Sequence, residues 1–474
     1  MRRIVSLAAA GVALAGPSLA EEACRALADL RLPNVNMLSA VPVAATDDLP
    51  AHCSLRGYVR PAINFEIRLP DDWNGGLYVA GCGGMCGQLL SDAPGFVNAM
   101  NHGLRRGYAA ATMDGGHWGA NSADARFAFG NRIAEVDWSE RAVRETANVA
   151  KAAVEAFYGA APAPSIFAGC STGGRQGYMA ALRDPALFDG ILAGAPALDY
   201  TGLVATFFSH LGQANLDAEG NQILTTDLVP LIHETALTQC DAADGIEDGL
   251  ISDPDACTVD WSAAACTDGA NAPCLTAAQI GVLEAWESEP VNSAGESLYP
   301  ATIPVGSEPF WPLWLTGLET GGGRFNLGIG ASFLQNMAFR EDPGEGFGIA
   351  DFDFDRDPPR LGFMAAILNT DAPDLTAFAE AGGRMITWHG LADAVVPHGK
   401  TVAHFEALRE THGKALDEVN RLFLIPGMDH CGIQGVTGVT QAGFDPLTAL
   451  ETWLATGEAP ESLIYARTAA EGEP

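Results

Sequence analysis

The sequence predicts an α/β protein built on a mostly parallel sheet. Two observations carry this prediction: short apolar runs alternate with longer segments of helical apolar spacing, and glycine and proline punctuate both kinds of segment. The expected strands are residues 64–70, 76–80, 108–113, 165–168, 190–195, 384–389 and 421–426. The expected helices are residues 138–158 and about 175–183, and the first carries Val143, Ala147, Val154 and Phe157 on one side.

The middle of the chain lacks this alternation. Between about Asp199 and Thr370 the sequence has four cysteines, many glycines and the tryptophans Trp261, Trp286, Trp311 and Trp314. We therefore expect residues 199–370 to be an inserted, helical and loop-rich lid domain on a core formed by residues 21–198 and 371–474. The alternative is an independent C-terminal domain that starts near Asp199, and it fails if residues after 380 complete the same sheet.

Charge restricts the partners. The 474 residues include 26 basic and 59 acidic side chains, which gives a formal net charge of -33. Such a surface repels nucleic-acid phosphates and anionic lipid headgroups, so we expect a small substrate as partner and no nucleic acid. We expect no membrane anchor, because no apolar run reaches the roughly 18–20 residues that span a bilayer and no lipobox cysteine lies at the expected cleavage point.

The N-terminus predicts export. Arg2 and Arg3 precede an apolar run over residues 4–15, and small residues around Ala20 suit a signal peptidase, so residues 1–20 are expected to be a signal peptide. A buried N-terminal helix is the alternative. All ten cysteines follow this segment, and an even number favours disulfides in an oxidising compartment. The sequence thus predicts a secreted or periplasmic protein.

A serine motif is the strongest chemical signal. Gly169-Cys170-Ser171-Thr172-Gly173 follows an expected strand and opens an expected helix. In this context Gly-x-Ser-x-Gly forms a nucleophile elbow, a sharp turn that exposes the serine at the carboxyl end of the sheet. We predict Ser171 as a nucleophile, with a tight structural turn as the alternative.

A base and an orienting carboxylate follow in the chain. A serine hydroxyl is a weak nucleophile unless a histidine takes its proton and a carboxylate fixes that histidine. Asp393 lies on the loop after expected strand 384–389, and His430 lies just beyond strand 421–426. The order Ser, Asp, His is that of α/β-hydrolases. The sequence therefore predicts a catalytic triad of Ser171, Asp393 and His430, although a lone loop histidine is more often a surface residue.

Two cysteines flank this triad. Cys170 directly precedes Ser171, and Cys431 directly follows His430. If Ser171 and His430 meet, the two sulfurs also come together, and an oxidising compartment would join them. The alternative is a pair of buried thiols. The chain-entropy estimate for closing so long a loop is about 5 kcal/mol of stabilisation.

The Cys-Ser nucleophile, the later Asp and the His-Cys pair resemble the tannase and feruloyl esterase family over most of the mature chain. The resemblance implies an α/β-hydrolase core with an inserted lid domain. It also implies five disulfides: Cys170–Cys431, Cys24–Cys53, Cys240–Cys257, Cys266–Cys274 and, as a local bridge, Cys82–Cys86. Thr172 departs from family members that have a carboxylate after the nucleophile.

An oxyanion hole needs two backbone donors aimed at the tetrahedral intermediate. We expect one to be the amide of Thr172. The other is expected from Gly83 or Gly84 in the glycine-rich loop at residues 81–87, where missing side chains allow a close approach. The alternative for this loop is an ordinary tight turn.

An acidic loop in the middle segment predicts a cation site. Residues 241–250 combine closely spaced carboxylates with glycines, which suits a hard, oxygen-seeking cation. The resemblance implies a structural Ca²⁺ held by the side chains of Asp241, Asp244 and Asp248 and the carbonyls of Ile246 and Leu250, with no organic cofactor. A solvated acidic turn is the alternative.

Substrate contacts are harder to assign. The candidates that flank the acid loop are His389, Val395 and Val396, and the lid candidates are Arg324, Ser332 and Trp311. Trp314, Phe310, Phe325 and Phe333 are further members of an expected aromatic wall. Arg324 and Ser332 are candidates to meet a substrate carboxylate or phenol.

These features predict an exported serine carboxylic ester hydrolase. The resemblance to the tannase and feruloyl esterase family implies esters of aromatic acids as substrates, of the feruloyl, galloyl or mono(2-hydroxyethyl) terephthalate type. One alternative is another acyl hydrolase, a lipase or a peptidase, on the same scaffold. The other is a non-catalytic, calcium-stabilised binding protein.

Overall fold

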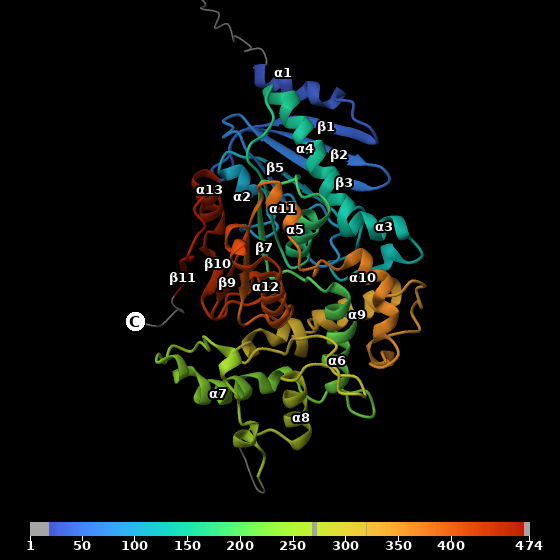
Figure 1. Cartoon of the computed structure of the whole chain (residues 1–474). Coiled ribbons are helices and arrows are strands. Elements are labelled where there is room, and N and C mark those ends of the chain that lie inside the picture. Colours follow the sequence, from blue (N-terminus) through green and yellow to red (C-terminus); the bar gives the residue numbers. More distant parts are fainter. Residues whose placement is uncertain (1–18, 268–272, 319, 469–474) are drawn as a thin grey trace, which may run out of the picture.

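A nine-stranded sheet forms the centre of the protein in the computed structural model, which describes residues 19–267, 273–318 and 320–468 (Figure 1). The strand order is β1-β2-β3-β5-β4-β6-β7-β8-β9. The strands are β1 Val35–Val43, β2 His52–Val59, β3 Ile63–Pro70, β4 Leu77–Ala80, β5 Ala109–Met113, β6 Ser165–Cys170, β7 Gly190–Gly194, β8 Arg384–Gly390 and β9 Asn420–Ile425. A separate pair is β10 Val439–Phe444 and β11 Tyr465–Arg467.

The sheet is parallel where the chemistry was predicted. β5, β4, β6, β7, β8 and β9 pair in parallel, whereas β1, β2, β3 and β5 pair antiparallel. All seven expected strands are present, with ends that differ by one or two residues. β1 and β2 were not predicted from the sequence. The strands that follow residue 380 complete the same sheet, so the alternative of an independent C-terminal domain is wrong.

Helices cover both faces of this sheet, and a further group lies beyond one end of it (Figure 1). They are α1 Leu19–Ala26, α2 Met100–Arg105, α3 Arg132–Val136, α4 Ala142–Tyr158, α5 Thr172–Arg183, α6 Phe208–Ala214, α7 Val229–Cys240, α8 Ala277–Trp286, α9 Phe325–Asn336, α10 Gly362–Leu368, α11 Thr376–Glu380, α12 Gly399–His412 and α13 Pro446–Thr456. The expected helix 138–158 is a short π-helix, Asp137–Arg141, followed by α4. The helix after Ser171 begins at Thr172, three residues earlier than expected.

Side-chain alternation along the strands separates two cores. On one face Tyr78 and Ile166 pack with Leu104 of α2 and with Trp453 of α13. On the other face Phe167 belongs to the larger core, which includes residues of α4 and α5. This α/β-hydrolase-type fold leaves the carboxyl ends of the parallel strands as the place where loops converge.

The predicted leader falls almost wholly outside the described residues. Of residues 1–20, only Leu19 and Ala20 are described, and they begin α1. Among the helices of the described ranges, none has the length and apolar character that a bilayer crossing requires.

Among its described residues, the chain between β7 and β8 contributes no strand to the nine-stranded sheet. It holds α6 to α11 and several short 3-10 and π turns, and Figure 1 shows α6, α7, α8 and α9 gathered beyond one end of the sheet. Aromatic side chains pack inside it, for example Trp286 against Trp311 with ring centroids 5.1 Å apart.

This segment leaves and re-enters the core at one place. The carboxylate of Asp199 accepts hydrogen bonds from the amide of Gly202 at 2.9 Å and from the side chain of Asn369 at 2.6 Å. The Asn369 side-chain oxygen in turn accepts from the amide of Thr201 at 3.1 Å, and the Thr370 amide donates to the Leu198 carbonyl at 2.8 Å. Departing and returning chains are thus bonded to each other.

Asn369→Ala is expected to destabilise the protein because it leaves the partly buried Asp199 carboxylate and the Thr201 amide without this partner. The expected loss in free energy of unfolding is about 1–3 kcal/mol. Urea unfolding would measure it. Asn292→Ala is the control, since that side chain bonds within its own exposed loop, and its expected cost is below about 1 kcal/mol. Equal losses in the two variants would contradict a role for this junction.

Candidate active site

The turn between β6 and α5 has the geometry of a nucleophile elbow. Ser171 has φ 65° and ψ −124°, a conformation that L-residues rarely adopt and that persists only where the surroundings enforce it. Its amide donates to the carbonyl of Gly194 at 3.0 Å. A Cβ at Gly169 would lie 2.6 Å from the backbone of Gly173, and one at Gly174 would lie 2.3 Å from the Gly194 oxygen. The glycines of the motif are therefore sterically required.

The predicted acid and base are hydrogen-bonded to each other. His430 Nδ1 donates to Asp393 Oδ2 at 2.7 Å, which leaves Nε2 as the ring nitrogen able to accept a proton. The other Asp393 oxygen accepts the amides of Val395 and Val396 at 2.8 and 2.9 Å. Burial alone would raise the pKa of Asp393, but the charge of His430 and the hydrogen bonds from His389 and His430 outweigh it and hold that pKa well below its usual range. Asp393 is thus an ionised partner for His430.

The residues around Asp393 support it and do not form an open wall. His389 is fully buried, and its ring nitrogens bond to Thr401 Oγ1 at 3.0 Å and to the Val396 carbonyl at 2.6 Å. Val395 is also buried. The polar groups and burial of His389, Val395 and Val396 thus fix the acid loop, and a substrate contact at these three residues remains a prediction.

A second carboxylate lies beside the base. Asp429 is buried, one of its oxygens accepts the Gln434 amide at 3.0 Å, and the other has no hydrogen-bond partner among the described residues. Burial, reinforced by the negative charge of Asp393, raises the pKa of Asp429 to about 7. The pKa values of the two carboxylates near His430 are therefore shifted in opposite directions, that of Asp393 down and that of Asp429 up. Only Asp393 stays ionised at acidic pH.

A disulfide joins the elbow to the histidine loop. Cys170 and Cys431 are bonded, with Cα atoms 6.1 Å apart, and they are the chain neighbours of Ser171 and His430. The structure also contains the other four pairs that the resemblance implies, so all ten cysteines are bonded: Cys24–Cys53, Cys82–Cys86, Cys240–Cys257 and Cys266–Cys274.

The glycine-rich loop after β4 lies against the elbow. Thr172 Oγ1 donates to the Gly84 carbonyl at 2.8 Å, which ties this loop to the residue after Ser171. Within the described chain, the amides of Gly83 and Gly84 have no protein acceptor, whereas that of Cys82 donates to the Gln176 side chain at 3.2 Å. Gly84 has φ +55°, and a Cβ there would lie 2.2 Å from the Ser122 oxygen.

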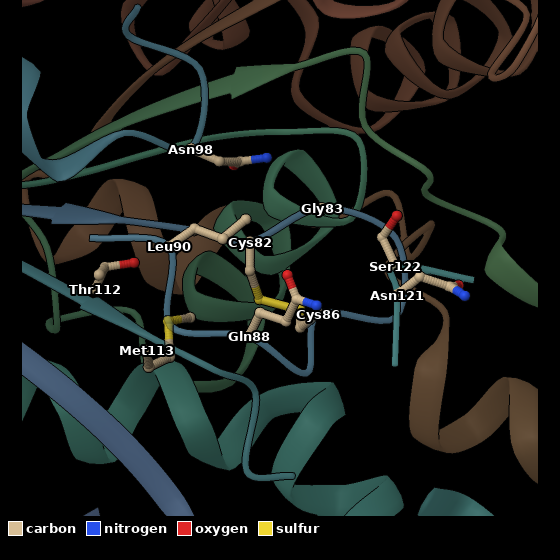
Figure 2. Close-up of a pocket in the computed structure, with 11 residues that line it drawn as sticks. Cys82, Gly83, Cys86, Gln88, Leu90, Asn98, Thr112, Met113, Asn121 and Ser122 are labelled. Carbon is tan, nitrogen blue, oxygen red and sulfur yellow. A yellow bond between two sulfur atoms is a disulfide. The ribbon is translucent and has the colours of Figure 1, made fainter. Parts of the chain in front are cut away.

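A pocket of about 260 Å³ opens beside this loop (Figure 2). Its walls combine amide and hydroxyl side chains with apolar ones and with the Cys82–Cys86 disulfide, and no charged side chain lines it. The lining residues are Gly81, Cys82, Gly83, Cys86, Gln88, Leu90, Asn98, Thr112, Met113, Asn121 and Ser122. None of these except Gly83, Cys82 and Cys86 was singled out from the sequence.

Trp314, and not Trp311, is the tryptophan next to the base. The Trp314 ring lies edge-on to His430 with centroids 5.7 Å apart, and Phe325 also packs edge-on to Trp314 at the same centroid distance. Trp311 is buried and donates its Nε1 hydrogen to Ser307 Oγ at 2.9 Å. The Trp311 ring thus packs inside the middle segment, and a substrate contact at this residue remains a prediction.

The other lid candidates have different surroundings. Ser332 Oγ accepts the amide of Ala125 at 2.8 Å, so this hydroxyl joins α9 to the loop before α3. Arg324 is exposed at the N-terminus of α9 with φ +56°. The structure does not bring Arg324 and Ser332 to a common partner, and both remain predictions as substrate contacts.

Carboxylates of the acidic loop at residues 241–250 accept hydrogen bonds from backbone amides of the same loop. Asp241 accepts the amides of Asp248 and Gly249 at 3.1–3.2 Å, and Asp244 accepts that of Ile246 at 2.9 Å. The donor types suit Ca²⁺, but within residues 19–267, 273–318 and 320–468 no three acidic, histidine or cysteine side chains converge as a metal site. The carbonyl ligands expected at Ile246 and Leu250, and the ion itself, stay predictions.

The fold and this turn define a class: an α/β-hydrolase-type protein whose elbow presents a serine next to a histidine loop. The sequence profile of the tannase and feruloyl esterase family matches residues 50–473. The chain belongs to that family, and it is an ester hydrolase of the tannase and feruloyl esterase type.

Relatives of similar length agree. The chain is 33% identical over 524 residues to an uncharacterised esterase of Xanthomonas campestris, covering 98% of this chain and 87% of the relative. It is 30% identical over 520 residues to mono(2-hydroxyethyl) terephthalate hydrolase of Piscinibacter sakaiensis, covering 94% and 85%. The crystal structure of feruloyl esterase B from Aspergillus oryzae superposes with a TM-score of 0.83 at 25% identity, covering 95% and 93%.

Removal of the Cys170–Cys431 bond is expected to lower both stability and turnover. The pair closes a sequence separation of 261 residues, and the chain-entropy model gives roughly 5 kcal/mol for a loop of that size. Cys170→Ala/Cys431→Ala should lose several kcal/mol in chemical unfolding, and kcat should fall more than KM changes.

The control is Cys266→Ala/Cys274→Ala, which opens a separation of only 8 residues in the middle segment. That variant should lose roughly 2.5 kcal/mol and keep kcat. If both double variants keep wild-type kcat, the bond has no role in positioning the base.

Proposed function

We propose that the chain is an exported serine carboxylic ester hydrolase that cleaves esters of aromatic acids through an acyl-enzyme. The observation that carries this proposal is the hydrogen bond of His430 to the ionised, buried Asp393, on a loop tied by a disulfide to the residue before Ser171. A base, its orienting acid and a serine on a strained elbow are what acyl transfer requires.

Acylation begins when Ser171 Oγ attacks the ester carbonyl carbon. His430 Nε2 takes the hydroxyl proton as the new C–O bond forms, and the carbonyl oxygen becomes an oxyanion. The amides of Thr172 and of Gly83 or Gly84 stabilise that charge. When the tetrahedral intermediate collapses, the ester C–O bond breaks, the alcohol leaves with the proton from His430, and the acyl group stays on Ser171.

Deacylation repeats the sequence with water. His430 removes a proton from water, whose oxygen attacks the acyl carbon, and the proton then passes to the Ser171 oxygen as the acid is released. Asp393 holds the histidine in the tautomer with hydrogen on Nδ1 and stabilises the imidazolium in both halves.

The aromatic preference rests on Trp314 and Phe325. Aromatic pairs favour edge-to-face geometry, and Trp314 presents such a surface directly beside His430. Relatives named as feruloyl esterases and as mono(2-hydroxyethyl) terephthalate hydrolase suggest feruloyl, galloyl or terephthaloyl esters as candidates. Arg324 is a candidate partner for a substrate carboxylate or phenol.

Export and a structural Ca²⁺ complete the proposal. Five disulfides fit an oxidising compartment, and a signal peptide over residues 1–20 would deliver the chain there. The acidic loop at residues 241–250 carries the three carboxylates Asp241, Asp244 and Asp248 within eight residues. We assign Ca²⁺ there a stabilising role and no chemical step.

Ser171→Ala is expected to abolish ester hydrolysis while the fold is retained, because no other group supplies the nucleophile. The panel is methyl gallate, methyl ferulate, mono(2-hydroxyethyl) terephthalate and nitrophenyl acetate. We expect at least one aromatic ester to exceed nitrophenyl acetate in kcat/KM, and a loss on the order of 10⁴-fold or more in the variant. Ser288→Ala, an exposed serine of the middle segment, should be fully active.

Two results would contradict this proposal. Full activity of Ser171→Ala would exclude the serine mechanism. Turnover of nitrophenyl acetate alone would leave the mechanism intact and exclude the aromatic substrate class.

Millimolar Ca²⁺ is expected to raise the Tm of EDTA-treated protein, because an ion that binds only the folded chain stabilises it by mass action. Asp241→Asn should remove most of the shift. Asp217→Asn is the matched control, since Asp217 also closes an exposed acidic loop through backbone amides, and it should keep the shift. No shift in the wild type would show that the loop is a solvated turn.

A further inference from the structure

The side chain of Asn98 is hydrogen-bonded to both backbone groups of the residue before the nucleophile. Asn98 Oδ1 accepts the Cys170 amide hydrogen at 3.1 Å, and Asn98 Nδ2 donates to the Cys170 carbonyl at 3.2 Å. This exchange of two bonds with one residue is what a neighbouring antiparallel strand provides. A single amide side chain thus takes the place of a strand at the end of β6.

The sheet needs that substitute at this position. β4 pairs with β6 only as far as Ala80 opposite Ala168, and the Gly81 amide then bonds to the Ala168 carbonyl. Beyond Gly81 the chain turns away to form the glycine-rich loop. Strand alternation directs the backbone groups of Cys170 to the side that β4 has left, so Asn98 satisfies groups that would otherwise lose their partners.

Asn98 also lies against the two segments that Ser171 must work with. A Cβ on Gly83 would lie 3.4 Å from Asn98 Nδ2, and a Cβ on Gly173 would lie 2.2 Å from Asn98 Oδ1. Figure 2 shows Asn98 among the pocket-lining residues, above Cys82 and Gly83 in this view. The Asn98 side chain therefore lies between the proposed oxyanion loop and the elbow and sets the spacing between them.

The segment that carries Asn98 is itself held in place. Gln441 of β10 accepts the amides of Phe96 and Val97 through one side-chain oxygen, at 2.9 and 3.1 Å. Asn98 has φ +50°, a left-handed conformation that asparagine tolerates better than most residues. The backbone that carries Asn98 is therefore held in place by Gln441, independently of the bonds that the Asn98 side chain makes to Cys170.

We propose that Asn98 is a positioning residue that sets the spacing between the Ser171 elbow and the oxyanion donor at Gly83. The inference rests on the proposed serine mechanism. In this proposal Asn98 does not touch the reacting atoms. Its side chain acts by holding the backbone of Cys170 and by limiting how close Gly83 can approach. Catalytic geometry must be held to within about 0.5 Å, so a small drift of either segment reduces the rate of the chemical step.

The test compares Asn98→Ala with Asn215→Ala. Asn215 makes the same kind of clamp, because its side chain bonds to both the amide and the carbonyl of Leu224, at 2.7 and 3.1 Å, in the middle segment. It is buried to a similar extent or more, and it lies outside the proposed catalytic machinery. The two variants remove the same bonds in different places, so their Tm losses should be comparable.

The readouts are kcat and KM for nitrophenyl acetate and the rate of labelling by a fluorophosphonate, all well below Tm. In Asn98→Ala we expect kcat and the labelling rate to fall about 10- to 100-fold, with KM changed less than about threefold. The fall should be uniform across the pH profile, since both hydrogen bonds of the described Asn98 side chain go to Cys170 and neither goes to His430 or Asp393. Asn215→Ala should keep both rates.

Asn98→Asp is the second variant, because it keeps the side-chain shape and the acceptor for the Cys170 amide but loses the donor to the carbonyl. It should show a smaller fall than Asn98→Ala. Wild-type rates in either folded Asn98 variant, or an equal fall in Asn215→Ala, would overturn the inference. An active Ser171→Ala would instead overturn the proposed function, so the two failures are distinguishable.

Discussion

The bond between Cys170 and Cys431 is the constraint on which the proposed site depends. It connects the ends of β6 and β9, strands that are separated in the sheet by β7 and β8, and its two cysteines are the chain neighbours of Ser171 and His430. The turn that carries Ser171 and the loop that carries His430 are local structures, and neither one alone fixes the position of the other. The crosslink covalently joins the chain neighbours of the proposed nucleophile and base, and the hydrogen bond of His430 to Asp393 fixes the orientation of the His430 ring.

Around that link, backbone geometry is enforced from several directions. Ser171 holds a left-handed conformation because Gly194 receives its amide on one side and Asn98 clamps Cys170 on the other. The motif glycines leave room for these contacts. His389 and the amides after Asp393 hold the acid loop in the same way. The proposed chemistry thus rests on groups that never meet the substrate.

Local patterns allowed much of this to be predicted from the sequence. The strand before Ser171, the glycines around it, and the positions of Asp393 and His430 after strands are short-range signals, and the seven expected strands are present. The Cys170–Cys431 pair followed from the expected meeting of Ser171 and His430, whereas the other four pairings followed from the family resemblance. β1 escaped prediction because it is an edge strand with Pro42 inside, a residue that weakens a strand pattern.

Features that depend on tertiary packing were not predictable. Which tryptophan faces His430 depends on the turn of the chain near Pro312, so Trp311 and Trp314 look alike in the sequence and differ in the structure. The sequence places His389 just before the acid loop, but only the structure shows that its ring is buried and bonded to Thr401 and Val396. Asn98 carries no motif, since its partner is 72 residues away.

Mass spectrometry of the fluorophosphonate-treated mature protein tests the central claim most directly. The account predicts one adduct per chain, located by peptide mapping on Ser171, with loss of esterase activity in proportion to labelling. An adduct on another residue, or an active esterase that takes up no label, would contradict Ser171 as the nucleophile.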